Sequence, residues 1–269
     1  MDRRPIGIFD SGLGGLTCVR EVMNIMPGED IIYFGDTGRV PYGARSAQQI
    51  IKYVRQDINF LKTFDIKYII IACGTASSAA LPMIKDEYDI DITGVLYPAA
   101  KKALSMTKNG RIGVIGTQGT IRSGKYTKQL LEFDKDLKVI EAACPLFVHL
   151  VENGHTNTIP AKLIAEEYLE PIKKAGVDTL ILGCTHYPLL KGIISEILGS
   201  SVALIDSGAA AAGFAKEEME KKDILSEKKT GGAVKYFVSD IPEGFEKLGG
   251  LFLNREITHK VERIDIERF

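Results

Sequence analysis

Short runs of apolar residues alternate with longer amphipathic stretches along the chain. The apolar runs are rich in isoleucine and valine without polar alternation, which is typical of parallel strands covered on both faces. Between two of these runs, residues 46–63 carry Ile50, Val54, Ile58 and Leu61 at helical spacing. Strand–helix alternation predicts parallel βαβ units and an α/β fold. The expected strands are residues 6–9, 31–34, 68–72, 112–115, 139–142 and 179–182.

The pattern also contains an approximate internal repeat. Residues 6–12 resemble residues 112–118, and residues 70–75 resemble residues 181–186. In each half, a strand followed by a hydroxyl side chain comes first, and a strand that ends in cysteine comes later. Two matches in the same order predict two similar domains with parallel-type sheets flanked by helices. We expect a pseudo-twofold relation between them, with an active site in between.

The chain beyond the second half predicts a discontinuous first domain. Residues 233–238 and 261–266 resemble further strands. We expect them to return to the first domain, which then comprises residues 1–97 and 208–269. The second domain comprises residues 98–207.

Charge and composition exclude several classes of partner. The 269 residues include 34 basic and 35 acidic side chains, so the net charge of −1 gives no reason to expect a nucleic acid or an anionic membrane. No apolar run approaches the roughly 18–20 residues of a membrane helix, and no signal peptide is recognisable. We therefore expect a cytoplasmic protein whose four cysteines are reduced thiols.

Two cysteines occupy positions suited to catalysis. Cys73 and Cys184 each follow a predicted strand and precede a predicted helix start, and ligands of parallel sheets bind at the carboxyl ends of the strands. A helix N-terminus favours a thiolate, and His186 lies two residues beyond Cys184. Cys18 and Cys144 lack such surroundings and are interpreted as structural.

Other interpretations of these residues remain open. Buried core thiols are common, although two matched by the repeat fit this explanation less well than one. Zinc would require more ligands than Cys184 and His186 supply, and we predict no metal site. The glycine turn at residues 10–16 does not match a dinucleotide fingerprint because Thr17 stands where the last glycine should be. Its free amides suit a carboxylate instead.

Five motifs in order resemble the glutamate racemases of bacterial cell-wall synthesis. The motifs are Phe9-Asp10-Ser11-Gly12-Leu13-Gly14-Gly15-Leu16, Gly35-Asp36-Thr37 with Pro41-Tyr42-Gly43, Ala72-Cys73-x-Thr75-Ala76-Ser77, Ala143-Cys144-Pro145-Leu146-Phe147-Val148 with Val151-Glu152, and Gly183-Cys184-Thr185-His186-Tyr187-Pro188. The resemblance implies an isomerase that interconverts L- and D-glutamate for peptidoglycan biosynthesis. It also implies that no pyridoxal phosphate, metal or nucleotide is used, and that the protein is a homodimer.

The resemblance assigns roles to individual residues. Cys73 would serve the α-proton of the D-isomer and Cys184 that of the L-isomer, one acting as base while the other acts as acid. Asp10 would assist Cys73, with Asp36 as a further helper on that side. His186 and Glu152 would assist Cys184. The implied substrate-binding residues are Asp10, Ser11, Tyr42, Gly43, Gly74, Thr75, Thr117, Thr185 and His186.

Two positions depart from the family pattern. Gly74 stands where the family has asparagine, so only its backbone can contact a substrate. His149 stands where proline is usual. Three alternatives follow: a two-cysteine racemase acting on aspartate, a binding or regulatory protein on the same scaffold, and a redox protein. The last requires Cys73 and Cys184 to lie within disulfide distance, with Cα atoms less than about 7 Å apart.

Overall fold

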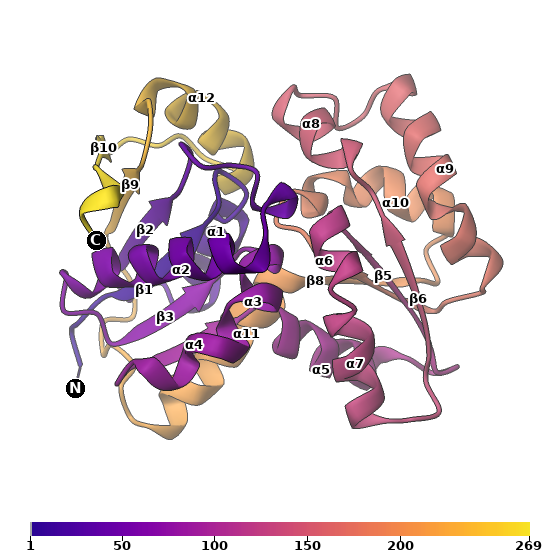
Figure 1. The fold of residues 1–269 in the computed structure, drawn as a ribbon, viewed down its shortest axis with the longest axis horizontal. Helices are drawn as coiled ribbons and strands as arrows, with labels where there is room; N and C mark the ends of the chain where they lie inside the picture. Colours follow the sequence, from indigo (N-terminus) through magenta and orange to yellow (C-terminus); the bar gives the residue numbers. More distant parts are fainter. Residues whose placement is uncertain (1) are drawn as a thin grey trace.

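The fold consists of two parallel sheets, each flanked by helices, in a computed structural model that describes residues 2–269. Figure 1 shows them side by side, with both chain termini on the half that carries the six-stranded sheet. The predicted α/β fold with two parallel-type sheets is therefore confirmed.

The strands are ten in number within the described residues, and every paired neighbour runs parallel. The first sheet has the order β10-β9-β2-β1-β3-β4, and the second has the order β6-β5-β7-β8. The strand bounds are β1 Ile6–Asp10, β2 Ile31–Gly35, β3 Tyr68–Ile71, β4 Asp91–Gly94, β5 Arg111–Gly116, β6 Lys138–Ala143, β7 Thr179–Leu182, β8 Ala203–Asp206, β9 Val234–Val238 and β10 Val261–Arg263.

The internal repeat appears as a shared strand order. Strands β2-β1-β3-β4 of the first sheet follow the same order as β6-β5-β7-β8 of the second. Phe9 on β1 pairs with Ile71 on β3, just as Ile115 on β5 pairs with Leu182 on β7. Cys73 and Cys184 thus follow equivalent central strands of the two sheets.

The helices cover both faces of each sheet. Helix α2 has the predicted pattern: Ile50, Val54, Ile58 and Leu61 are all buried, and Ser46 accepts a hydrogen bond from the backbone of Gln49 at the helix start. The helix bounds are α1 Leu16–Ile25, α2 Ala47–Lys62, α3 Gly74–Ala79, α4 Leu81–Ile84, α5 Leu96–Met106, α6 Gln118–Arg122, α7 Lys125–Phe133, α8 Leu146–Glu152, α9 Ile159–Lys174, α10 Lys191–Leu198, α11 Ser207–Lys221 and α12 Pro242–Leu253.

Two helices carry the chain across between the sheets. Helix α5 follows β4 of the first sheet but packs on β7 and β8 of the second, while α11 follows β8 and packs on α1, β3 and β4. The tail then adds β9 and β10 beside β2 of the first sheet. These crossings support our proposed division into residues 1–97 with 208–269 and residues 98–207.

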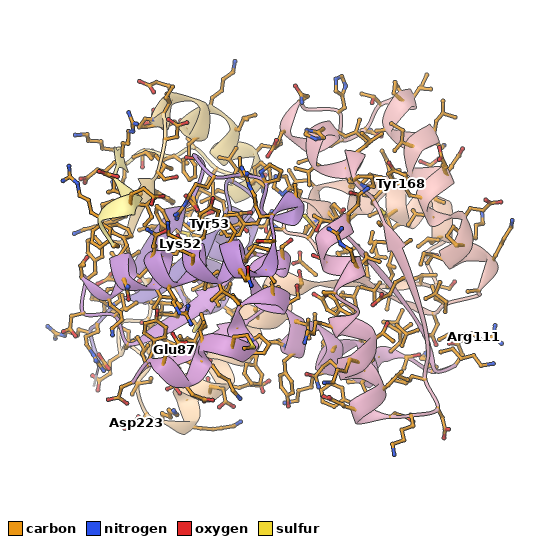
Figure 2. All side chains as sticks on the ribbon, viewed as in Figure 1. Lys52, Tyr53, Glu87, Arg111, Tyr168 and Asp223 are labelled. Atoms are coloured by element: carbon orange, nitrogen blue, oxygen red, sulfur yellow. The ribbon has the colours of Figure 1, made fainter. Side chains whose placement is uncertain are left out.

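The interior is largely apolar, and most charged side chains lie on the outer surface. Buried isoleucines and valines of the strands fill the space between sheets and helices, whereas charged side chains such as Glu87, Arg111 and Asp223 lie at the periphery (Figure 2). Within residues 2–269, every helix is too short or too polar to span a membrane.

Candidate active site

A small cavity lies between the two domains, and both candidate cysteines line it. Its volume is about 50 Å³, and its walls come from the segments that follow β1, β2, β3, β5, β6 and β7. These are the carboxyl ends of strands, where ligands of parallel sheets bind. The cavity therefore brings the equivalent ends of both sheets together.

Cys73 lies at the start of helix α3. It is 6% exposed, and its sulfur accepts a hydrogen bond from the backbone N–H of Ala76 at 3.5 Å. The thiol is also 3.5 Å from the hydroxyl of Ser11, to which it can donate. The short helix thus begins at the cysteine itself, as the sequence predicts.

Asp10 ends β1 and lies under the glycine turn. Its Oδ2 accepts hydrogen bonds from the backbone N–H groups of Gly12 and Gly15 at 3.1 and 3.0 Å. Its Oδ1 is buried and has no donor among the described residues. Burial raises the pKa of Asp10, while the charge of His186 and the turn amides oppose this shift.

A hydrogen-bonded row of side chains lies on the Cys184 side. The Cys184 sulfur is 3.9 Å from Nδ1 of His186, and Nε2 of His186 is 3.0 Å from Oε1 of Glu152. Helix α8 supplies Glu152, while the other two residues follow β7. The carboxylate orients the imidazole, which in turn contacts the thiol.

The two sides differ in their proton affinities. Burial and, to a smaller extent, the charge of Asp10 raise the pKa of Cys73 to about 12, so this thiol carries its proton at neutral pH. Burial alone would lower the pKa of His186, but its hydrogen bonds to Cys184 and Glu152 outweigh burial and raise it to about 10. A neutral thiol therefore faces a site whose other side holds an imidazolium.

Three threonine hydroxyls meet where the domains touch. Oγ1 of Thr75 is 3.2 Å from Oγ1 of Thr117 and 3.4 Å from Oγ1 of Thr120, and the latter two are 3.1 Å apart. Thr75 comes from the first domain, and the other two lie on α6 or cap it. Such a cluster offers several donors to a carboxylate.

Glycines allow the main chains of the two domains to approach each other closely. A Cβ on Gly74 would lie 2.4 Å from the carbonyl oxygen of Gly183, and one on Gly119 would lie 2.8 Å from the carbonyl oxygen of Gly43. On the other side of the site, a Cβ on Gly14 would overlap Thr185. Side chains at these positions would require the domains to move apart.

Most of the sequence-predicted site residues line this cavity, and three lie behind it. The lining includes ten of them: Ser11, Tyr42, Gly43, Cys73, Gly74, Thr75, Thr117, Cys184, Thr185 and His186.

Asp10, Glu152 and Asp36 are absent from the lining. Asp10 accepts hydrogen bonds from the glycine turn, Glu152 contacts the cavity residue His186, and Asp36 is held by the side chains of Arg39, Tyr42 and Ser239.

Five further lining residues were not predicted from the sequence. They are Val40, Pro41, Thr120, Val148 and Gly183. The sequence does contain a signal for Thr120. It lies three residues after Thr117, and the first turn of a helix places such a residue next to the cap residue. Nothing in the apolar character of Val40 or Val148 distinguishes them from core residues.

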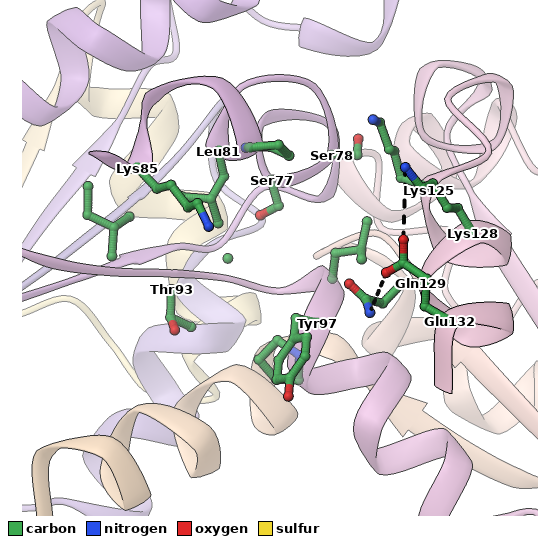
Figure 3. A pocket seen from close by; sticks show the side chains of 15 residues that line it. Ser77, Ser78, Leu81, Lys85, Thr93, Tyr97, Lys125, Lys128, Gln129 and Glu132 are labelled. Atoms are coloured by element: carbon green, nitrogen blue, oxygen red, sulfur yellow. Dashed lines mark hydrogen bonds and ion pairs between the residues drawn. The ribbon is translucent and has the colours of Figure 1, made fainter. Parts of the chain in front are cut away.

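Other features bear on the alternative interpretations. All four cysteines are free thiols and buried. Among residues 2–269, no group of three or more His, Cys, Asp and Glu side chains is arranged to hold a metal ion. A larger cavity of about 450 Å³, lined in part by Ser77, Tyr97, Lys125 and Lys128, lies between α4 and α7 (Figure 3). It contains neither Cys73 nor Cys184, so both candidate cysteines belong to the smaller cavity.

The chain is similar to racemases over nearly its whole length. Residues 17–215 match the family described as Asp/Glu/Hydantoin racemase. A glutamate racemase from Geobacter metallireducens is 45% identical over 257 residues, which cover 96% of this chain and 95% of that protein.

Solved structures show the same likeness. Glutamate racemase isoform RacE1 from Bacillus anthracis has a TM-score of 0.94 and 38% identity, with 98% of each chain covered. Glutamate racemase from Francisella tularensis, solved in complex with D-glutamate, has a TM-score of 0.92 and 36% identity, with 100% of each chain covered.

Proposed function

Because the chain belongs to the Asp/Glu/Hydantoin racemase family and is an amino-acid racemase, we propose that it interconverts L- and D-glutamate with two thiols and no cofactor. The reaction would supply D-glutamate for peptidoglycan synthesis. The observation that carries this proposal is the pair Cys73 and Cys184, which line one cavity from equivalent strand ends of two similar domains. Racemisation needs an acid and a base on opposite faces of the α-carbon, and this arrangement suits that need.

The raised pKa values of Cys73 and His186 support a starting state for the L-to-D direction in which Cys73 carries a proton and His186 is charged. The Cys184 sulfur takes the α-proton of L-glutamate, and the electron pair of the broken C–H bond remains on the α-carbon. Cys73, protonated at neutral pH because burial raises its pKa, then delivers its proton to the opposite face. The imidazolium of His186 stabilises negative charge on the neighbouring sulfur. For D-glutamate the two thiols exchange roles.

Polar groups at the cavity are available for the rest of the substrate. The unpartnered Oδ1 of Asp10 can accept a hydrogen bond from the substrate ammonium. The hydroxyls of Thr75, Thr117 and Thr185, the hydroxyl of Ser11 and the backbone around Gly43 can bind the carboxylates. Because Gly74 has no side chain, only its backbone contributes.

Substrate entry requires the cavity to widen. One water molecule needs about 10–15 Å³ of cavity volume. A cavity of about 50 Å³ therefore holds only a few waters. Glutamate is several times larger than water. We therefore propose that the domains separate to admit it and close again to exclude water during proton transfer.

Isotope exchange tests the proposal directly. Purified protein is incubated with L- or D-glutamate in deuterated water without added cofactor, and deuterium at the α-position is followed by NMR. We expect exchange with both isomers, and loss of net racemisation, followed by circular dichroism, in Cys73→Ala and Cys184→Ala. Racemisation that survives in both variants would contradict the two-thiol mechanism, and aspartate in parallel tests the nearest alternative substrate.

A further inference from the structure

A buried charged cluster lies directly behind the turn that carries Tyr42 and Gly43. The side chains of Asp36 and Asp57 are 0% exposed, and that of Arg39 is 10% exposed. Burying charges is unfavourable unless each is paired and hydrogen-bonded. The cluster lies outside the cavity lining, so its role must be exerted through residues that reach the cavity.

Arg39 joins the loop after β2 to helix α2. Its Nε donates to Oδ2 of Asp36 at 2.7 Å, and its Nη2 donates to Oδ1 of Asp57 at 3.0 Å. Its Nη1 donates to Oε1 of Gln56 at 2.5 Å. Because the guanidinium is a planar fork with fixed donor directions, it sets the separation of the two carboxyl groups.

Tyr42 lies between these carboxyl groups with only one proton to donate. Its hydroxyl is 2.5 Å from Oδ2 of Asp36 and 3.0 Å from Oδ2 of Asp57. A phenol donates one hydrogen bond. If both carboxyl groups were ionised, one of these contacts would join two acceptors without a proton between them. One carboxyl group must therefore carry a proton.

The surroundings identify Asp57 as the protonated partner. Asp36 accepts from Arg39, Tyr42 and the hydroxyl of Ser239, three donors in all. Oδ2 of Asp57 contacts only Tyr42. Burial, followed by the charge of Asp36, raises the pKa of Asp57 well above its usual range.

The position of Tyr42 decides where Gly43 meets the second domain. Tyr42 and Gly43 share one 3₁₀ turn, Tyr42–Ala44. A Cβ on Gly43 would lie 3.2 Å from Oγ1 of Thr117, and one on Gly119 would lie 2.8 Å from the carbonyl oxygen of Gly43. A shift of the turn would therefore change the cavity wall at these threonine and glycine contacts.

We propose that Arg39 and Asp57 are positioning residues of the active site, and that a protonated Asp57 donates to the Tyr42 hydroxyl, which donates to Asp36. With this proton count, Asp57 and Tyr42 are neutral, and Arg39 pairs with Asp36 and, on its outer side, with Oε1 of Glu267 at 3.3 Å. The chain of donors fixes the turn and with it the substrate-binding wall at Gly43. The inference rests on the proposed function only in its kinetic consequence.

Matched variants separate the members of the cluster. In Asp57→Asn the amide donates to Tyr42 and its oxygen accepts from Arg39, so the hydrogen bonds persist. In Asp36→Asn the amide oxygen can still accept from Arg39 and Tyr42, but the amide nitrogen faces the Ser239 hydroxyl, which must then accept instead of donate, and the negative charge beside Arg39 is lost. Arg39→Lys replaces the planar guanidinium with an ammonium group, which cannot fix the separation of the two carboxyl groups. As a control, Arg55→Lys changes an arginine of the same helix α2 whose ion pair with Glu87 is exposed.

Steady-state kinetics with both glutamate isomers gives the first readout. We expect KM to rise about tenfold in Asp36→Asn and Arg39→Lys, with kcat changed far less, because hydrogen bonds to charged groups are lost behind the binding wall. Asp57→Asn should be less impaired than Asp36→Asn because it keeps the hydrogen bonds, and the control Arg55→Lys should stay within about twofold of wild type. A purely structural role would reduce the folded fraction and the apparent kcat, and would leave KM unchanged.

Infrared difference spectroscopy gives a second readout that does not depend on activity. The spectrum of wild type minus Asp57→Asn should contain the carbonyl band of a protonated carboxylic acid at neutral pH. Absence of that band, or an Asp57→Asn variant as impaired as Asp36→Asn, would overturn the protonation of Asp57. An unchanged KM in Arg39→Lys would overturn the positioning role. A wild type that racemises neither isomer would contradict the proposed function instead, and the infrared result would still decide the state of Asp57.

Discussion

At the scale of single residues, strand ends bring the two candidate thiols to one cavity, while other contacts hold Asp36 behind it. Cys73, Cys184 and His186 all line one cavity because strand ends, whose positions the apolar runs reveal, carry them there. Asp36 follows β2 in the same way, yet Arg39, Tyr42 and Ser239 hold it behind the turn. Ser239 comes from the loop after β9, and Asp57 of α2 in turn holds Arg39 and Tyr42. Contacts of such long range leave no local signal in the sequence.

Glu152 should control the pH range over which His186 remains charged. The pKa of His186 is raised to about 10, so its proton is present at neutral pH and is lost as the pH rises through that value. Glu152→Gln removes the negative charge 3.0 Å from Nε2 and should lower this pKa. We expect the alkaline limb of the kcat profile with L-glutamate to move to lower pH.

The measurement is a pair of pH–rate profiles for wild type and Glu152→Gln. Glu166→Gln, a change at an exposed position on α9, is the matched control and should leave the profile unmoved. An alkaline limb at the same pH in Glu152→Gln and wild type would show that Glu152 does not tune His186.

Gly74 should control how far the empty site closes. Because Gly74 has no side chain, Gly183 can approach it closely. A Cβ on Gly74 would lie only 2.4 Å from the carbonyl oxygen of Gly183 and would overlap it. Gly74→Ala should therefore destabilise the closed empty state relative to the wider state that glutamate needs, which lowers KM several-fold. Gly74→Asn adds an amide as well, so we expect a larger fall.

Initial-rate kinetics with D-glutamate distinguishes the outcomes. Gly192→Ala, at an exposed helical glycine with open space around it, should leave KM unchanged. A rise of KM in both Gly74 variants would mean that the close approach of Gly74 and Gly183 persists in the substrate complex.

At the scale of elements, continuous apolar runs identified the central strands, and the short outer strands escaped notice. Strands β4 and β8 pair with β3 and β7 and are only partly buried at their first residues. Their mixed sequences, Asp91–Gly94 and Ala203–Asp206, therefore lack a strand pattern. Both strands lead directly into the helices that cross between the domains, so the missed elements are the ones that set the connection.

The cap of α11 should contribute measurably to stability. Oδ1 of Asp206 accepts from the backbone N–H groups of Gly208 and Ala209, and Oδ2 pairs with Lys191 at 2.9 Å. Asp206→Ala leaves these amides without an acceptor and should lower the free energy of unfolding by about 1–2 kcal/mol.

Urea unfolding followed by circular dichroism measures this loss. Asp206→Asn keeps an oxygen for the amides and loses only the charge that faces Lys191, so its destabilisation should be smaller. Equal stability of Asp206→Ala and wild type would show that water replaces the cap without loss.

At the scale of the whole molecule, the repeat predicted two facing domains but not how closely they meet. The sequence shows glycines at positions 43, 74, 119 and 183 without showing that they oppose one another across the interface. That pairing depends on the relative placement of two sheets, which α5 and α11 determine through packing. The small cavity is thus a property of the assembled pair.

The two domains should unfold together because one core joins them. A single cluster of buried side chains includes Ile8 and Ile70 of the first sheet together with Leu180 and Leu182 of the second. The chain contains no tryptophan, so one introduced tryptophan reports on one domain. Tyr88→Trp in the first domain and Tyr168→Trp in the second should give coincident urea transitions. Separate midpoints would show that each sheet is stable without its neighbour.

Substrate should stabilise both reporters equally, because one cooperative transition shares the binding free energy between the two domains. A ligand that binds only the folded state raises the free energy of unfolding by about 2.7 kcal/mol when its concentration is about a hundred times Kd. In D-glutamate, the Tyr88→Trp and Tyr168→Trp transitions should therefore move to higher urea by the same amount. A shift confined to one reporter would locate the binding contacts in that domain alone. It would then contradict a site in which Cys73 and Cys184 act on the same α-carbon, because that site requires both strand ends to hold the substrate at once.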